Sequence, residues 1–151
     1  MSVRARAATR LVSAAAAVAL GAILLVSPGA SMGTAAELPQ APPNVNIVAP
    51  TNGEVVTDPA VMIRWTSSGL EVVAAALATR QEQAHFHVFV DTAPDLTVTE
   101  PWGAEAIHTG EYELRLDNLG PGTHTVWVAA GFMDHTPYQP YAVDSVTFVM
   151  R

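Results

Sequence analysis

The sequence predicts an all-β domain, an antiparallel sandwich of about seven strands, from two observations. Short segments alternate between apolar and polar residues, as strands of a half-buried sheet do; in residues 60–66, Val61, Ile63 and Trp65 share one face. Turn-forming pairs such as Asn52-Gly53 separate these segments at close intervals. Seven or so strands in about 105 residues fit an immunoglobulin-like sandwich. The chain has no cysteine for the disulfide usual in antibody domains.

The expected strands follow one another along the chain at residues 45–49, 54–56, 60–66, 85–91, 112–117, 123–130 and 142–150. Residues 70–73 are expected as a short strand and loop with a helical turn, because the alanine-rich stretch after them favours helix. Two long loops are predicted, one containing Pro94 and Pro101 and one containing Pro137 and Pro140. The domain is therefore rich in loops at the ends of its strands.

The first 36 residues have the order of a secretory signal peptide. Three arginines lie within the first ten residues, an uncharged apolar run follows at 11–26, and Ser27-Pro28-Gly29 breaks any helix. This run is shorter than the roughly 20 apolar residues of a membrane-spanning helix. We expect cleavage after Ala36, with Ala30 or Ala35 as alternatives, and hence a secreted or periplasmic protein.

The rest of the chain divides into two parts. Residues 37–44 are expected to form a proline-rich linker, and residues 45–151 a single β-sandwich domain. Removal of the signal peptide leaves four basic residues against fourteen acidic ones, a formal charge of −10. Because nucleic acids and anionic membranes are bound by clustered lysine or arginine, neither is an expected partner. The absence of cysteine excludes thiolate nucleophiles, iron–sulfur clusters and cysteine-based zinc sites.

Histidines carry the strongest functional pattern. All of them fall in the predicted domain, and they are His85, His87, His108, His124 and His135. His85 and His87 are two apart on one strand, so their side chains leave the same face with Cα atoms about 6.6 Å apart, near enough to share one ion. The others lie at strand ends or in loops, which gather at the rims of a sandwich. His124 also has a structural interpretation, as a partly buried histidine that is hydrogen-bonded to the backbone.

Neutral imidazoles suit copper or zinc better than calcium or magnesium. Asp91 and Asp134 either ligate the ion or orient an imidazole ring, and Met133 either offers a thioether to Cu(I) or fills the core. An alternative binding site, for a peptide or a glycan, is an aromatic patch on the loops. Its residues would be Trp102, Tyr138 and Tyr141.

Four histidine-bearing segments also occur together in a known family. Residues 84–92 (AHFHVFVDT), 107–110 (IHTG), 119–125 (LGPGTHT) and 134–137 (DHTP) resemble a family of exported bacterial domains known as domain of unknown function 4399. The resemblance implies that the five histidines belong to one constellation, and it brings no established activity. This chain departs from the family pattern at Phe86, where the family has a third consecutive histidine, and at Tyr138, where a further histidine and ligand is lost.

The first hypothesis is therefore a secreted or periplasmic module that binds copper or zinc without catalysis. The alternative is an extracellular interaction or structural domain with no metal, whose partner is a protein or a glycan and whose histidines serve loop structure or pH sensing. A metal-dependent enzyme is the third hypothesis.

Overall fold

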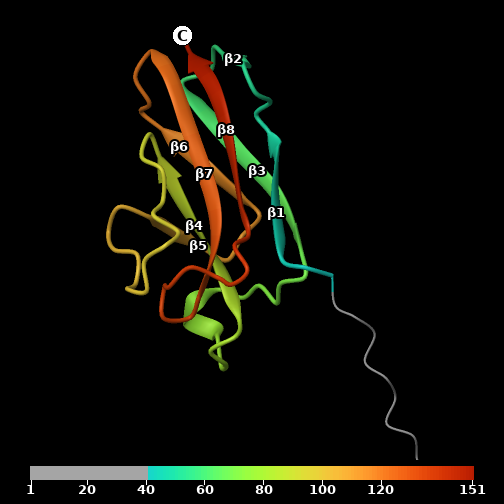
Figure 1. Cartoon of the computed structure of the whole chain (residues 1–151). Helices are drawn as coiled ribbons and strands as arrows, with labels where there is room; N and C mark the ends of the chain where they lie inside the picture. Colours follow the sequence, from blue (N-terminus) through green and yellow to red (C-terminus); the bar gives the residue numbers. More distant parts are fainter. Residues whose placement is uncertain (1–40) are drawn as a thin grey trace, which may run out of the picture. The chain divides into compact units, whose positions relative to one another are not determined.

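The computed structural model describes residues 41–151; the predicted signal peptide and the first part of the linker lie outside the described residues. Two β-sheets make up the described chain (Figure 1). The strands are β1 (Asn44–Ala49), β2 (Val55–Val56), β3 (Ala60–Ser68), β4 (Ala84–Val90), β5 (Ile107–Thr109), β6 (Glu113–Asp117), β7 (Gly122–Phe132) and β8 (Val143–Met150). A 3₁₀ helix, η1 (Ala75–Leu77), lies in the connection between β3 and β4.

The strand order is that of an immunoglobulin-like sandwich. One sheet has the order β1-β3-β6 and the other has the order β2-β8-β7-β4-β5. Taken as strands A, A′, B, C, C′, E, F and G, these are the sheets ABE and A′GFCC′. All neighbouring strands in the two sheets are antiparallel except β2, which pairs with β8 in parallel. The predicted fold class is confirmed.

The structure differs from the prediction in three details. The described chain has eight strands, because residues 107–109, expected to lie just before the strand at 112–117, pair with β4 as a separate strand β5. Residues 70–73 form no strand; Val72 makes a single bridge to Ala84, and the helical turn comes later as η1. Strand β1 begins at Asn44, one residue inside the predicted linker.

The main core fills the space between the two sheets. Trp65 of β3 packs edge-on against Phe86 of β4, with ring centroids 5.4 Å apart, and both side chains are buried. Val88, Val126 and Phe148 extend this core along the five-stranded sheet. The alternation of β4 therefore places its phenylalanine and valines between the sheets, and sends His85, His87 and Phe89 to the opposite face.

That opposite face is covered as well. Phe89 forms a second buried cluster with Trp102 and Ala106, which come from the long loop between β4 and β5, and with Ala129 of β7. Strand β4 is consequently buried on both faces, and not only on one as expected. The apolar residues of the loop explain the difference, because they cover a sheet face that would otherwise meet water.

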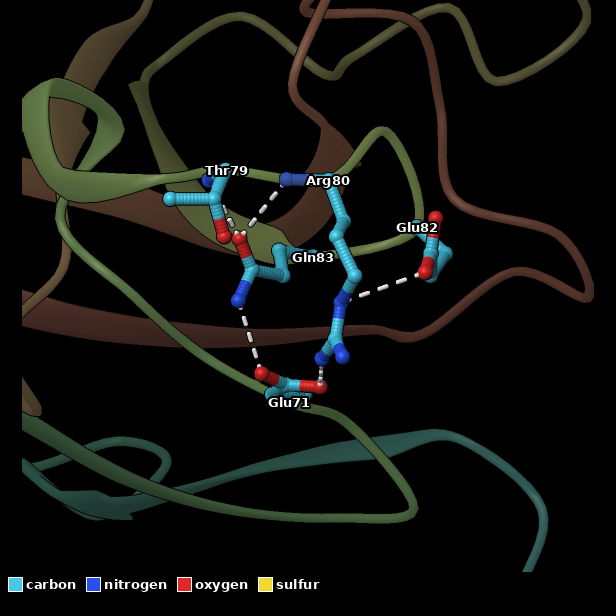
Figure 2. Close-up of polar contacts among 5 residues, drawn as sticks. All are labelled: Glu71, Thr79, Arg80, Glu82 and Gln83. Carbon is cyan, nitrogen blue, oxygen red and sulfur yellow. Dashed lines mark hydrogen bonds and ion pairs between the residues drawn. The ribbon is translucent and has the colours of Figure 1, made fainter.

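Polar contacts fix the connection that leads into β4 (Figure 2). The side-chain oxygen of the buried Gln83 accepts hydrogen bonds from the backbone N–H groups of Thr79 (2.7 Å) and Arg80 (3.1 Å), and its Nε2 donates to Glu71 (2.7 Å). Arg80 in turn forms ion pairs with Glu71 and Glu82. These contacts anchor the residues directly before His85. Within residues 41–151, the structure contains no helix long and apolar enough to span a membrane.

Candidate metal centre

Two neighbouring strands and one turn bring four of the histidines together. His85 and His87 project from the outer face of β4, and the strand register places His108 of β5 directly opposite His87. The rings of His87 and His108 have centroids 4.5 Å apart, as expected for a close cross-strand pair. His135 arrives from the turn after β7, where its centroid lies 4.8 Å from that of His85.

Backbone hydrogen bonds hold the turn that carries His135. Its N–H donates to the carbonyl oxygen of Phe132 (2.9 Å), and its own carbonyl oxygen accepts from the N–H of Trp102 (2.9 Å). His135 has a φ of 68°, in the left-handed region that non-glycine residues seldom adopt. Such a conformation costs free energy and persists where surrounding contacts determine it.

One nitrogen from each of these four rings lies close to the nitrogens of the other three. The four ligand atoms of His85, His87, His108 and His135 lie within 4.8 Å of one another. Nε2 of His87 and Nδ1 of His135 are 3.4 Å apart. Four nitrogens arranged as a tetrahedron about 2.0–2.1 Å from an ion would be about 3.3–3.4 Å apart. One edge of the site therefore has the spacing of a tetrahedral centre, and no edge is longer than 4.8 Å.

Loss of solvent favours the neutral form of three of the four rings. Desolvation, followed by the charges of the neighbouring histidines, lowers the pKa of His85 to about 4 and that of His87 to about 2. Burial and His135 also lower the pKa of His108. The sign follows because a low-dielectric environment disfavours the imidazolium, and several imidazoliums would repel one another. At neutral pH these rings therefore present free lone pairs, the form that binds a metal ion.

Buried nitrogens in the cluster lack hydrogen-bond partners among the described residues. They are both ring nitrogens of His85 and Nδ1 of His87. An unpartnered buried polar group costs about 1–3 kcal/mol. Coordination of an ion would use one of the two unpartnered nitrogens of His85.

Gly131 makes room for one of these rings. A Cβ added at Gly131 would lie 2.4 Å from Cε1 and 2.7 Å from Nδ1 of His87, far inside van der Waals contact. Trp102 packs edge-on against the same ring, at a centroid distance of 4.8 Å. Sequence reasoning missed Gly131, although an isolated glycine within an apolar strand signals a close approach of another group.

His124 does not join the cluster. Its Nδ1 lies 2.7 Å from a carboxylate oxygen of Asp91, and its Nε2 lies 2.8 Å from the carbonyl oxygen of Gly120. Both partners only accept hydrogen bonds, so the contacts favour a ring that is protonated on both nitrogens and raise the pKa of His124. His124 is therefore a partly buried histidine that is hydrogen-bonded to the backbone, as its structural interpretation expected. Asp91, which also accepts from the N–H of Thr125, serves His124 and not the four-histidine cluster.

The remaining expected residues lie around the site or away from it. Asp134 accepts hydrogen bonds from the N–H and the hydroxyl of Thr136, and so shapes the turn that holds His135. Met133 is half-buried in the same turn. Tyr138 stacks on Phe132, with centroids 4.4 Å apart, and packs against the main core.

Trp102 is also placed differently from one expectation. It is 6% exposed, because its ring packs against His87 and Phe89. Its indole N–H donates to the carbonyl oxygen of Asp95 (3.0 Å). Trp102 therefore cannot contribute to an exposed aromatic patch with Tyr138 and Tyr141.

Comparisons with known proteins return distant similarities in structure alone. The fibronectin(III)-like modules of Clostridium thermocellum CbhA match with 20% sequence identity and a TM-score of 0.45, over 71% of this chain and 96% of that one. The PKD domain of human KIAA0319 matches with 15% identity and a TM-score of 0.37, over 83% of this chain and 91% of that one. The fold assignment rests on the strand order and not on these similarities. No family model matches the chain, and no curated protein matches it, so the resemblance to domain of unknown function 4399 stays a prediction.

Proposed function

We propose that this domain binds a transition-metal ion, copper or zinc, through His85, His87, His108 and His135. The observation that supports this most strongly is the convergence of four imidazoles from three separate segments. Two of these imidazoles, those of His85 and His87, have no exposed surface. Burying neutral histidines side by side costs free energy unless their nitrogens find partners. An ion that accepts one lone pair from each ring gives the arrangement a purpose.

The ligand set favours copper and zinc over other ions. Imidazole nitrogen is a ligand of intermediate softness, which Cu²⁺ and Zn²⁺ prefer, whereas Ca²⁺ and Mg²⁺ require oxygen. The four-histidine cluster supplies nitrogen alone. Binding is favoured over catalysis, because four protein ligands complete the coordination shell of a tetrahedral ion and leave no position for a substrate or a water molecule.

Export is part of the proposal. A signal peptide cut after Ala36 would release the domain into the periplasm or the medium. Mass spectrometry of the protein recovered from expressing cells tests this directly. A mature chain that begins at Glu37 is expected, and recovery of the intact chain in the cytosol would contradict export.

Calorimetric titration of the purified protein with Cu²⁺ and with Zn²⁺ tests the metal site. We expect one ion per chain, and loss of that binding in the double variant His85→Ala/His87→Ala. His124→Gln is the matched control, because it removes a histidine that lies outside the cluster. Equal weak binding by the protein and the double variant would refute the proposal and leave the alternative of an interaction domain without metal.

A further inference from the structure

The four histidines differ in how far solvent can reach them. His85 and His87 lie on β4, between β7 and β5, and neither has exposed surface. His108 is exposed and His135 is half-buried. A second molecule would therefore reach an ion in this site from the side of His108 and His135.

The strands that carry the ligands also differ in how firmly they are held. Strand β4 pairs with β7 through seven residue pairs and with β5 on its other side. Strand β5 is three residues long and is the last strand of its sheet. Short edge strands open at a lower free energy than central strands. Among the three ligands on strands, His108 is therefore the one that can leave an ion most readily while His85 and His87 stay in place.

A carboxylate lies near the exposed ligand His108, and the described domain is acidic as a whole. Glu105 interacts electrostatically with His108, and Asp134 directly precedes His135. Residues 41–151 contain thirteen carboxylates and four arginines. Three of these arginines form ion pairs with acidic side chains: Arg64, Arg80 and Arg115. The net negative charge of the domain attracts cations and repels anionic molecules.

From this asymmetry, and resting on the proposed metal function, we propose that the domain passes its ion to an acceptor by ligand exchange at His108. An acceptor with neutral nitrogen donors, such as a histidine-bearing protein, binds the ion from the exposed side while His108 departs. One metal–nitrogen bond forms and one breaks. The charge and oxidation state of the ion do not change, and the released imidazole remains neutral. His85 and His87 hold the ion until the acceptor supplies further ligands.

Stopped-flow mixing of the Cu²⁺-loaded purified protein with excess L-histidine tests this route. Recovery of tryptophan fluorescence reports loss of Cu²⁺, since the Trp102 ring centroid lies 4.8 Å from that of His87. We expect the rate of recovery to rise in proportion to the L-histidine concentration. A rate that does not depend on concentration would overturn the proposal, because the ion would then leave before the acceptor arrives.

The variant His108→Ala sharpens the test. Without the departing ligand, copper transfer to L-histidine is expected to be at least about tenfold faster, whereas His124→Gln should match the unmodified protein. Unchanged transfer in His108→Ala would contradict the route, and if that variant cannot be loaded, the concentration dependence above still decides. Citrate, an anionic oxygen chelator, should act at least about tenfold more slowly than L-histidine at equal concentration. Equal rates with citrate and L-histidine would refute the claim that the acceptor has neutral nitrogen donors. Absence of copper binding in the unmodified protein would instead refute the proposed function itself.

Discussion

Gly131→Ala is the substitution whose effect the structure defines best. The new Cβ would lie 2.4 Å from Cε1 of His87, whereas carbon atoms in ordinary contact are about 3.5–4.0 Å apart. One group must therefore move by about 1 Å. The backbone of β7 is held by β4 and β8, so the imidazole of His87 has to shift, and it has no exposed surface into which to move.

Two opposing effects set the stability of this variant. Replacing glycine with alanine in a strand stabilises a protein by about 0.4–1 kcal/mol when the site has room, because the unfolded chain loses freedom. Overpacking a buried site costs about 1–3 kcal/mol. The contact at 2.4 Å makes overpacking dominate, so we expect Gly131→Ala to lower the free energy of unfolding in urea denaturation.

Metal affinity should fall more clearly than stability. Ligand distances in metal sites are held within about 0.2 Å, so a shift of about 1 Å removes His87 as a ligand. We expect calorimetric titration with Zn²⁺ to give an affinity lower by a factor of at least about ten.

Gly120→Ala provides the control for this variant, because a Cβ at Gly120 meets nothing within 4 Å. Its affinity should match that of the unmodified protein, and its free energy of unfolding should be equal or higher by up to about 1 kcal/mol. In the background of His87→Ala, adding Gly131→Ala should weaken binding no further, since the two residues act through the same ring. Normal Zn²⁺ affinity in Gly131→Ala would refute the role assigned to His87.

Three further predictions follow from the same contacts. The free energy of unfolding of the metal-free protein should fall below pH 6.5, because the folded-state pKa values of His85 and His87 lie below the pKa of histidine in the unfolded chain. Each of the two histidines should contribute on the order of 1 kcal/mol for each pH unit. Urea denaturation between pH 7 and pH 4 measures this, and a flat profile would contradict it. His124 should have the opposite pH dependence, because its pKa is raised in the folded state. His124→Gln should lower the free energy of unfolding by about 1 kcal/mol at pH 6, and by less as the pH rises through that raised pKa. A loss of stability that grows with pH would contradict the contact with Asp91. Gln83→Ala should destabilise the domain by about 1–3 kcal/mol in urea denaturation, because it leaves the N–H groups of Thr79 and Arg80 without their acceptor. Replacing the exposed Gln139 with alanine is the control and should have no effect. Equal stability of the two variants would refute the anchoring role of Gln83.

The sandwich was predictable because its strands carry a local signal. Alternation in residues 60–66 and 85–91 assigns each side chain to one of two faces, and turn residues mark the ends of strands. The covered outer face of β4 was not predictable in this way. Which loop folds over that face depends on long-range packing of Trp102 and Ala106, which local alternation does not encode.

The candidate site shows the same division. The pair His85 and His87 follows from strand periodicity alone, and His108 and His135 were expected as candidates without knowledge of the register. Strand pairing decided that His108 stands opposite His87. It also decided that His124 lies near Asp91, a residue 33 positions earlier in the chain, and so outside the cluster. No spacing rule in the sequence separates these two outcomes.

X-ray absorption spectroscopy of the Zn²⁺-loaded protein tests the central claim most directly, because it reports the ligands of the ion. We predict about four nitrogen ligands at about 2.0–2.1 Å, with the outer scattering typical of imidazole rings. A shell made mostly of oxygen, or a nitrogen shell that stays the same in His85→Ala/His87→Ala, would contradict a metal centre built from these four histidines.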